Sequence, residues 1–164
     1  MPPLRRQTTT SEPVAAVAFN LFPAAVDATL RGLLVLADSG KRVMLLADSY
    51  EPDTAHATWE DVAAHEIVGP GYTPGGVAAS VSAATLDGST AALAIDGALT
   101  WPGSSFTAKY AVMVHAAGAS VASSDRLVGW SDLNPDGDAL TLATGTLELT
   151  FEDNEILALE GDAW

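Results

Sequence analysis

The sequence predicts a mostly β, single-domain fold: a β-sandwich or barrel of about seven to eight short strands with one or two short helices. Apolar and polar residues alternate along several short segments, and turn-forming pairs recur between these segments. Hydrophobic residues make up 48% of the 164 residues, which is enough for one domain to bury its own core.

The strands are expected in the order in which the alternating segments occur. Residues 42–47 form a short apolar run bounded by turns, which predicts a buried strand. Residues 146–152 alternate cleanly, so Leu147, Leu149 and Phe151 are expected to point inward. Further strands are expected at residues 77–85, 90–95, 98–101, 109–115, 126–131 and 156–159.

Turn chemistry predicts how some of these strands connect. Asp96-Gly97 is the strongest hairpin signal, and it predicts that the strands on either side of it pair. Asp153-Asn154 is expected to turn residues 146–152 back into residues 156–159. Residues 69–76 (GPGYTPGG) exclude regular structure and predict a system of tight turns.

Two short helices are expected. Pro23 suits a first helical turn, and four apolar residues share one helical face, which predicts a helix over residues 23–36. These four are Val26, Leu30, Leu33 and Leu34. Thr58 is a good N-cap for a second helix through His65, because Glu60 and Asp61 follow it in the first turn.

The charge distribution is strongly asymmetric. Seven Lys and Arg stand against 21 Asp and Glu, giving a net charge of -14, so no nucleic-acid binding by the main body is expected. Arg5 and Arg6 precede the first acid, Glu12, and no basic residue follows Arg126. Either this asymmetry marks a basic arm and an acidic body that face different surfaces, or the charge simply keeps an abundant protein soluble.

Residues 1–13 (MPPLRRQTTTSEP) are rich in Pro, Thr and Arg, which predicts an extended N-terminal arm before a β-rich domain of residues 14–164. Residues 14–36 are apolar, but Pro23, Asp27 and Arg31 interrupt them, so no membrane contact is expected. The chain has no cysteine, which excludes disulfides and thiolate zinc sites.

Several motifs invite a chemical interpretation. Residues 132–138 (DLNPDGD) match the first half of a calcium loop, but Ala143 stands where a bidentate Glu belongs. We therefore favour a turn whose side chains hydrogen-bond to their own backbone. His56 and His65 match no metal-ligand spacing. The sequence has no nucleophile elbow and no phosphate loop, so the prediction is a protein that is not an enzyme and binds no cofactor or metal.

The tryptophans leave an alternative open. Trp59 or Trp101 at loop edges suits a carbohydrate- or receptor-binding module of a phage tail or secreted protein, with calcium at Asp132, Asn134 and Asp136. Core packing is the favoured fate of Trp101 and Trp130. Trp164 follows a polar and small-residue stretch, so it is expected to dock on a partner.

The order of segments resembles a small structural protein family of tailed bacteriophages. In that family a strand of the type K-V-x-L-L leads into S-Y-x-P-D-x-D-x-H, a short acidic helix and a G-x-G-Y-T-x-G-G turn. The matching residues here are 41–46, 49–56, 59–62 and 69–76. Residues 108–114, 127–132 and 156–159 resemble its later strands, so the likeness spans roughly residues 30–159.

The resemblance implies a non-enzymatic virion protein, assembled in the bacterial cytoplasm and present in many copies. A capsid-decoration or head-associated protein is expected, with a head fibre or a tail position left open. The expected partners are the major capsid protein or another virion protein, together with further copies of the chain. The arginine-bearing arm and the acidic C-terminus depart from the family pattern. The residues expected to bind a partner are Leu4, Arg5, Arg6 and Trp164.

Overall fold

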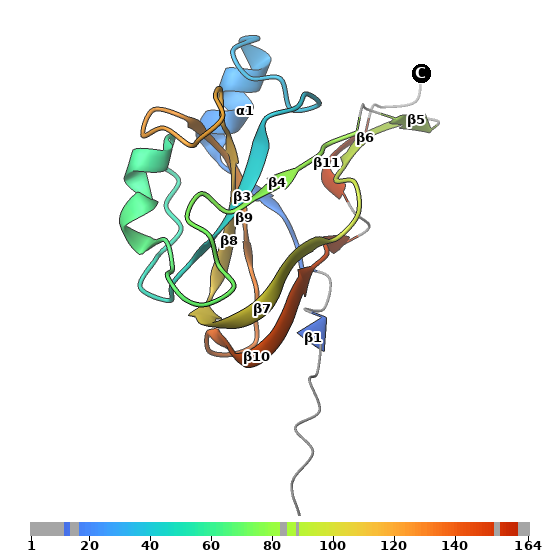
Figure 1. Ribbon diagram of the computed structural model, residues 1–164. Helices are drawn as coiled ribbons and strands as arrows, with labels where there is room; N and C mark the ends of the chain where they lie inside the picture. The colour runs from blue at the N-terminus through green and yellow to red at the C-terminus, as the bar shows by residue number, and fades with distance from the viewer. Residues whose placement is uncertain (1–11, 14–16, 83–84, 88, 153–154, 161–164) are drawn as a thin grey trace, which may run out of the picture.

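The computed structural model describes residues 12–13, 17–82, 85–87, 89–152 and 155–160. These residues form three β-sheets, one α-helix, α1 (Pro23–Leu30), and two 3-10 helices, η1 (Trp59–Asp61) and η2 (Ala63–His65) (Figure 1). The mostly β fold with short helices is therefore confirmed. Neither α1 nor the 3-10 helices in the described residues have the length and hydropathy needed to cross a membrane.

The largest sheet has five antiparallel strands in the order β2-β9-β8-β3-β4. Their bounds are β2 (Asn20–Leu21), β9 (Arg126–Asp132), β8 (Tyr110–His115), β3 (Lys41–Leu46) and β4 (Val77–Ala79). The central strands β3 and β8 bury successive residues on both faces, which explains why β3 is continuously apolar from Val43 to Leu46.

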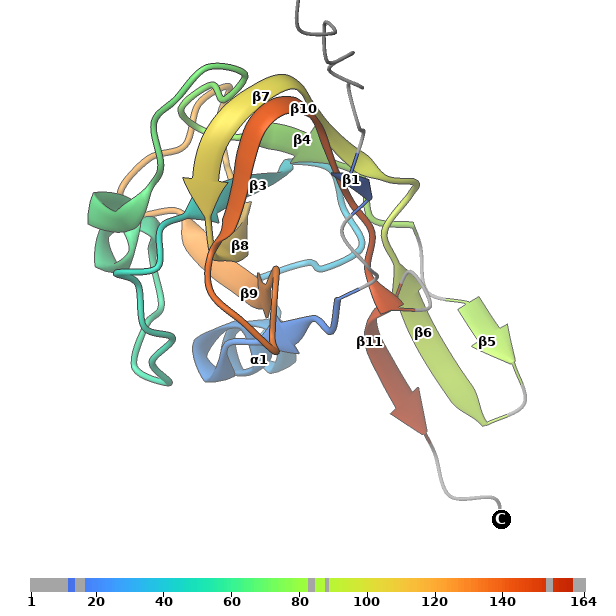
Figure 2. The same cartoon turned by 90° about the horizontal axis from the view of Figure 1, so that it is seen from below.

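A second sheet has the order β1-β10-β7 and curves across the five-stranded sheet, so that the two sheets enclose a common core (Figure 2). Its strands are β1 (Glu12–Pro13), β10 (Leu140–Leu149) and β7 (Leu99–Ala108). Leu147, Leu149 and Phe151 are all buried, as their alternation predicts. Trp101 also lies in this core, with 2% of its surface exposed.

The third sheet, which we call the outer sheet, projects from the side of the two others (Figures 1 and 2). It has the antiparallel order β11-β6-β5, with bounds β11 (Glu155–Glu160), β6 (Thr90–Ala94) and β5 (Thr85–Asp87). The described residues form eleven strands in all, more than the seven to eight predicted. Four of the strands have only two or three residues, too few to show periodicity.

Both predicted hairpin pairings are wrong, because the relevant strand edges are already occupied. β6 pairs with β11 and β5, so neither of its edges is left for β7 across Asp96-Gly97. β10 pairs with β7 on one edge, and its other edge holds β1, followed by Val17 opposite Phe151. The chain after β10 therefore crosses to the outer sheet; Asp153-Asn154 itself lies outside the described residues.

Helix α1 ends six residues earlier than predicted, and its buried face differs from the predicted one. Gly32 has a φ of 71° and donates its N–H to Thr29 O, while the Leu33 N–H bonds to Ala28 O. This Schellman arrangement closes the helix. As a result Ala25 and Ala28 face the core, and Leu30 is 83% exposed.

The glycine-rich segment 69–76 forms the fixed turn system that its composition predicts. The Glu66 carboxylate accepts hydrogen bonds from the Tyr72 hydroxyl at 2.6 Å and the Gly75 N–H at 2.7 Å. The Arg42 guanidinium donates to the carbonyl oxygens of Gly75 and Gly76. Burial and the adjacent Glu66 raise the pKa of Tyr72, so its phenol stays neutral and keeps donating to Glu66.

Candidate functional site

The histidines that the sequence singled out lie around one buried tyrosine. Tyr50 bonds to Nδ1 of His56 over 3.2 Å and stacks on its ring, and His65 Nδ1 bonds to Ser49 Oγ over 3.1 Å. Burial raises the pKa of Tyr50, so the phenol is neutral and serves as a hydrogen-bond partner. Within the described residues, no three His, Asp or Glu side chains gather in a way that could hold a metal ion.

The calcium-like loop of residues 132–138 is held together by a lysine of the chain itself. The Lys109 ammonium lies 2.9 Å from Asp132 Oδ1 and donates to the carbonyl oxygens of Asn134, at 2.6 Å, and Gly137, at 2.7 Å. Asp132 also accepts the Asn134 N–H. Two of the oxygens that a calcium loop would supply are thus already engaged: Asp132 Oδ1 lies against Lys109, and the Asp138 carbonyl oxygen accepts the Asn134 side-chain amide. A turn whose side chains hydrogen-bond to its own backbone accounts for this motif.

The aromatic residues proposed for sugar stacking are not accessible. Trp59 and Trp101 are 7% and 2% exposed, so neither offers a ring face to a ligand. Trp130 is half-buried and packs edge-on against Tyr110 at 6.0 Å, in a shallow cleft beside Asp132. Among the tryptophans that the structure describes, Trp130 is the one with an appreciable exposed part.

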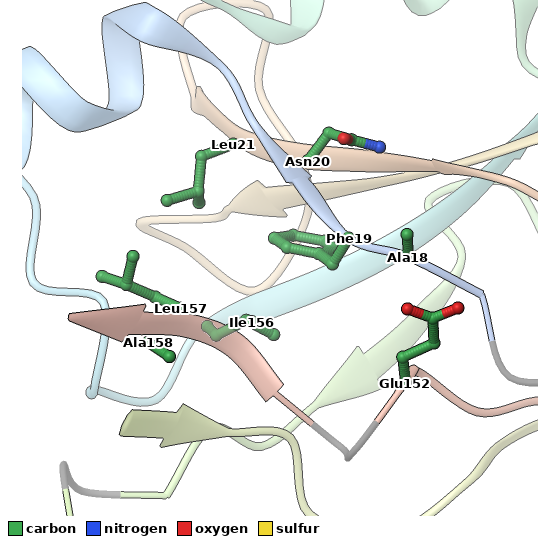
Figure 3. A pocket seen from close by; sticks show the side chains of 8 residues that line it. All are labelled: Ala18, Phe19, Asn20, Leu21, Glu152, Ile156, Leu157 and Ala158. Atoms are coloured by element: carbon green, nitrogen blue, oxygen red, sulfur yellow. The ribbon is translucent and has the colours of Figure 1, made fainter. Parts of the chain in front are cut away.

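A different site, which we call the edge cleft, opens between β2 and β11 (Figure 3). Val17 and the end of β10 are still joined: Val17 N–H bonds to Thr150 O, and Glu152 N–H bonds to Val17 O, each over 3.1 Å. Beyond this point the two segments separate. The space between them has a volume of about 480 Å³.

Both walls of the edge cleft are terminal strands of their sheets. β2 pairs with β9 on one side, and β11 pairs with β6 on one side. In the part of the chain that the structure describes, no backbone hydrogen bond joins β2 to β11. Each strand therefore presents unpaired backbone N–H and C=O groups, the property that lets an extended segment add to a sheet.

The side chains in the edge cleft are mainly apolar. Phe19, Leu21 and Ile156 lie in the gap between the two strands, and Glu152 lies at one end (Figure 3). Phe19 is held by an edge-to-face contact with Phe151 at 5.3 Å. The cleft therefore offers backbone groups and one carboxylate beside a few apolar side chains.

The residues that the sequence predicts to bind a partner are not part of the edge cleft in the described structure. Leu4, Arg5, Arg6 and Trp164 lie outside the described residues. Residues 12 and 13, the last two of the predicted arm, form β1 along β10. The edge cleft was not predicted from the sequence. The pattern that points to it is the alternation of Phe19, Asn20 and Leu21, which lies in a segment dominated by the helix pattern.

Comparisons with protein-family models, curated proteins and solved structures find no match for this chain.

Proposed function

We propose that the protein is a non-enzymatic structural subunit of a bacteriophage virion, a capsid-decoration or head-associated protein that attaches through its N-terminal arm. Its partner is the major capsid protein or another virion protein, and several copies act together. The observation that carries the proposal is the way the arm meets the fold. Glu12 and Pro13 pair in parallel with Leu147 and Glu148, so the arm begins from an extended, backbone-anchored position at a sheet edge.

The use of basic residues within the body supports an attachment role for the arm. Lys41 is buried and donates to Val35 O, Lys109 holds the loop of residues 132–138, and Arg42 holds the glycine-rich turn. Arg31 pairs with Asp27 at 2.8 Å on the helix surface. Most of the body's cations therefore serve the fold, whereas Arg5 and Arg6 belong to the arm and suit an acidic partner surface.

The segments that carry the phage resemblance support the same proposal, because they form much of the β-rich domain. They include β3, the turns around η1 and η2, the glycine-rich turn, and strands β8 and β9. Three of these strands are neighbours in the five-stranded sheet. The resemblance thus concerns the framework of the fold, and the attachment is assigned to the arm that departs from the family pattern.

Deletion of residues 1–11 tests the proposal while leaving β1 intact. The truncated protein is expected to unfold at the same urea concentration as the full chain but to be missing from purified particles, as measured by quantitative mass spectrometry. A double variant, Arg5→Glu with Arg6→Glu, keeps the length of the arm and is expected to lower incorporation at least tenfold. Normal incorporation of the truncated protein, or absence of the full chain from particles, contradicts the proposal.

A further inference from the structure

A cleft of about 490 Å³ lies at the end of the five-stranded sheet where β8 begins and β9 ends. We call it the aromatic cleft. Two aromatic side chains, two prolines and two polar side chains line it: Tyr110, Trp130, Pro52, Pro135, Asn20 and Asp132. A concave surface of this size, with a few polar groups among rings, has the usual form of a small-molecule site.

Strand register brings the two aromatic and the two polar side chains together. Asn20 of β2 pairs with Trp130 of β9, and Tyr110 of β8 pairs with Asp132 of β9. Residues directly opposite one another in an antiparallel pair project from the same face, and so do residues two apart on one strand. The four side chains therefore form one surface, and the two prolines come from the loops beside it.

The aromatic rings of this surface are held in place from behind. Tyr110 packs edge-on against Trp130 at 6.0 Å and against Tyr50 at 5.4 Å. Tyr50 is buried and stacks on His56. A ligand of the aromatic cleft therefore meets rings that are already ordered, so binding costs little side-chain entropy.

Two hydrogen-bond donors of the aromatic cleft are open to a ligand. Trp130 Nε1 and the Tyr110 hydroxyl make no hydrogen bond with any described residue. Trp101 Nε1 also lacks a partner there, but it is sealed in the core, whereas the two groups in the cleft reach the surface. They are therefore available to a ligand that carries acceptors.

Two acceptor oxygens accompany these donors. The Asn20 side-chain amide donates to Trp130 O at 3.4 Å, which leaves Asn20 Oδ1 as an acceptor. Asp132 Oδ1 lies against Lys109 and accepts the Asn134 N–H, whereas its Oδ2 makes no hydrogen bond within the described part of the chain. A ligand that fits the aromatic cleft must therefore both donate and accept.

The charges around the aromatic cleft disfavour an ionic ligand. The Lys109 ammonium lies 5.9 Å from the centroid of the Tyr110 ring and 2.9 Å from Asp132 Oδ1, so a second cation would meet a like charge there. An anion would meet Asp132 itself and the exposed carboxylates of Glu51 and Asp53, on either side of Pro52. The best ligand is therefore uncharged.

We propose that the aromatic cleft binds a neutral saccharide. A pyranose presents a face of C–H groups, which packs on the negative face of an aromatic ring, and a rim of hydroxyl groups that donate and accept. A proline-rich peptide fits less well, because proline has no N–H to donate to Asn20 Oδ1 or Asp132 Oδ2. This site does not depend on the virion function, because the arm takes no part in it.

Nuclear magnetic resonance of the full chain tests the site. The indole N–H signal of Trp130 is identified by its loss in Trp130→Leu. The probes are the methyl glycosides of glucose, galactose, mannose and N-acetylglucosamine, together with maltose and cellobiose. We expect at least one to shift the Trp130 signal saturably, with the same affinity in about 20 mM and about 500 mM NaCl, because salt does not screen a neutral ligand. The matching uronic acid is expected to bind at least tenfold more weakly.

Two variants and a control locate the bound sugar, with affinity measured by saturation transfer to the ligand's own signals. Trp130→Leu is expected to weaken binding at least tenfold, and Asn20→Ala at least threefold. Asn20 is exposed, so its variant keeps the test valid if circular dichroism shows that Trp130→Leu does not fold. Asp136→Asn is the control, because Asp136 is exposed beside Pro135 but does not line the cleft, and it should leave the affinity unchanged.

Four outcomes overturn the proposal. If no neutral probe shifts the Trp130 signal, the cleft is not a saccharide site. Binding that Asn20→Ala and a folded Trp130→Leu leave unchanged places the sugar elsewhere. Tighter binding of the uronic acid contradicts the charge argument. A shift caused by acetyl-triarginine amide, with none caused by the sugars, shows that the cleft takes a cationic segment instead.

Discussion

The five-stranded sheet and the outer sheet bury their side chains to very different extents. Val112, Val114 and Leu127 in the five-stranded sheet have no exposed surface, whereas Leu93, the most buried described side chain of β6, is 9% exposed and Leu159 is 60% exposed. Three of the five residues of β6 are alanines, which contribute little buried area. The five-stranded sheet therefore draws its stability from the core that it shares with the second sheet, and the outer sheet depends on whatever covers its open face.

The largest expected effect comes from Gly76, which fixes the glycine-rich turn against the five-stranded sheet. A Cβ there would lie 1.9 Å from Val43 O, and its φ of 64° disfavours other residues. Gly76→Ala is expected to lower the free energy of unfolding by about 3–5 kcal/mol, measured by urea denaturation, because a rigid backbone cannot yield. Gly97, in the turn after β6, has a φ of 74° and open space, so Gly97→Ala should cost about 1 kcal/mol.

That pair of variants compares the two regions at equal backbone strain. If both substitutions cost the same, the steric environment of Gly76 does not contribute, and the contrast between a tightly packed body and an open outer sheet is wrong.

Truncating one leucine in each sheet measures the difference in packing directly. Leu127→Ala in β9 removes a side chain with 0% exposure, so a loss of about 3 kcal/mol in unfolding free energy is expected. Leu93→Ala in β6 removes a side chain that borders a groove between the loop after α1 and the outer sheet, and about 1 kcal/mol is expected because fewer atoms surround it. A larger loss from Leu93→Ala than from Leu127→Ala would reverse the comparison.

A further variant tests whether the rigidity of the body extends into its loops. Lys109→Met keeps the length of the side chain but removes the donor to the Gly137 carbonyl oxygen and leaves the Asn134 carbonyl oxygen with the Gly137 N–H alone. We expect a loss of about 1–3 kcal/mol by urea denaturation. Arg126→Met is the control, because Arg126 is exposed on a neighbouring strand, and its effect should stay within about 0.5 kcal/mol.

The smallest effect is expected at Asp61, and it depends on pH. Hydrogen bonds from the Ala57 and Thr58 N–H groups lower the pKa of the Asp61 carboxyl below its ordinary value of 3.8. The stabilisation is therefore present above that value and is lost as the pH falls through the lowered pKa. Because Asp61 is exposed, Asp61→Ala should cost only about 0.5–1 kcal/mol at pH 7.

Urea midpoints of Asp61→Ala and wild type, measured at pH 7 and pH 2, check this sign. The two proteins should differ at pH 7, and the difference should shrink as the pH falls below 3.8 and the carboxyl takes up its proton in the folded chain. A difference that grows toward acid would show that the pKa of Asp61 is raised.

The sequence predicted those features that depend on local pattern. Alternation in residues 146–152 correctly predicted the burial of Leu147 and Leu149, and the composition of residues 69–76 correctly predicted a turn system. Strand pairing was predicted less well, because it depends on which edges are already filled. Asp96-Gly97 is a strong local hairpin signal, yet β6 already has a partner on each edge.

The helix and the edge cleft show two further limits of sequence reasoning. The spacing of Val26 and Leu30 fits a helical face, but Gly32 closes the helix first, and small alanines form the buried side instead. The edge cleft depends on the separation of β2 from β11, two segments more than 130 positions apart. Nothing local in either segment encodes that separation, whereas Phe19 and Leu21 alone predict no more than apolar packing.

The way the fold uses lysine has a practical consequence for chemical labelling. The chain contains only two lysines, Lys41 and Lys109, and each ammonium group donates its protons to loop carbonyl oxygens. Acylating reagents must reach the amine nitrogen, and the side chains of Lys41 and Lys109 are only 0% and 12% exposed. Amine-directed cross-linkers and fluorophores should therefore react slowly with the folded body, and rapid lysine acylation would report that its loops have opened.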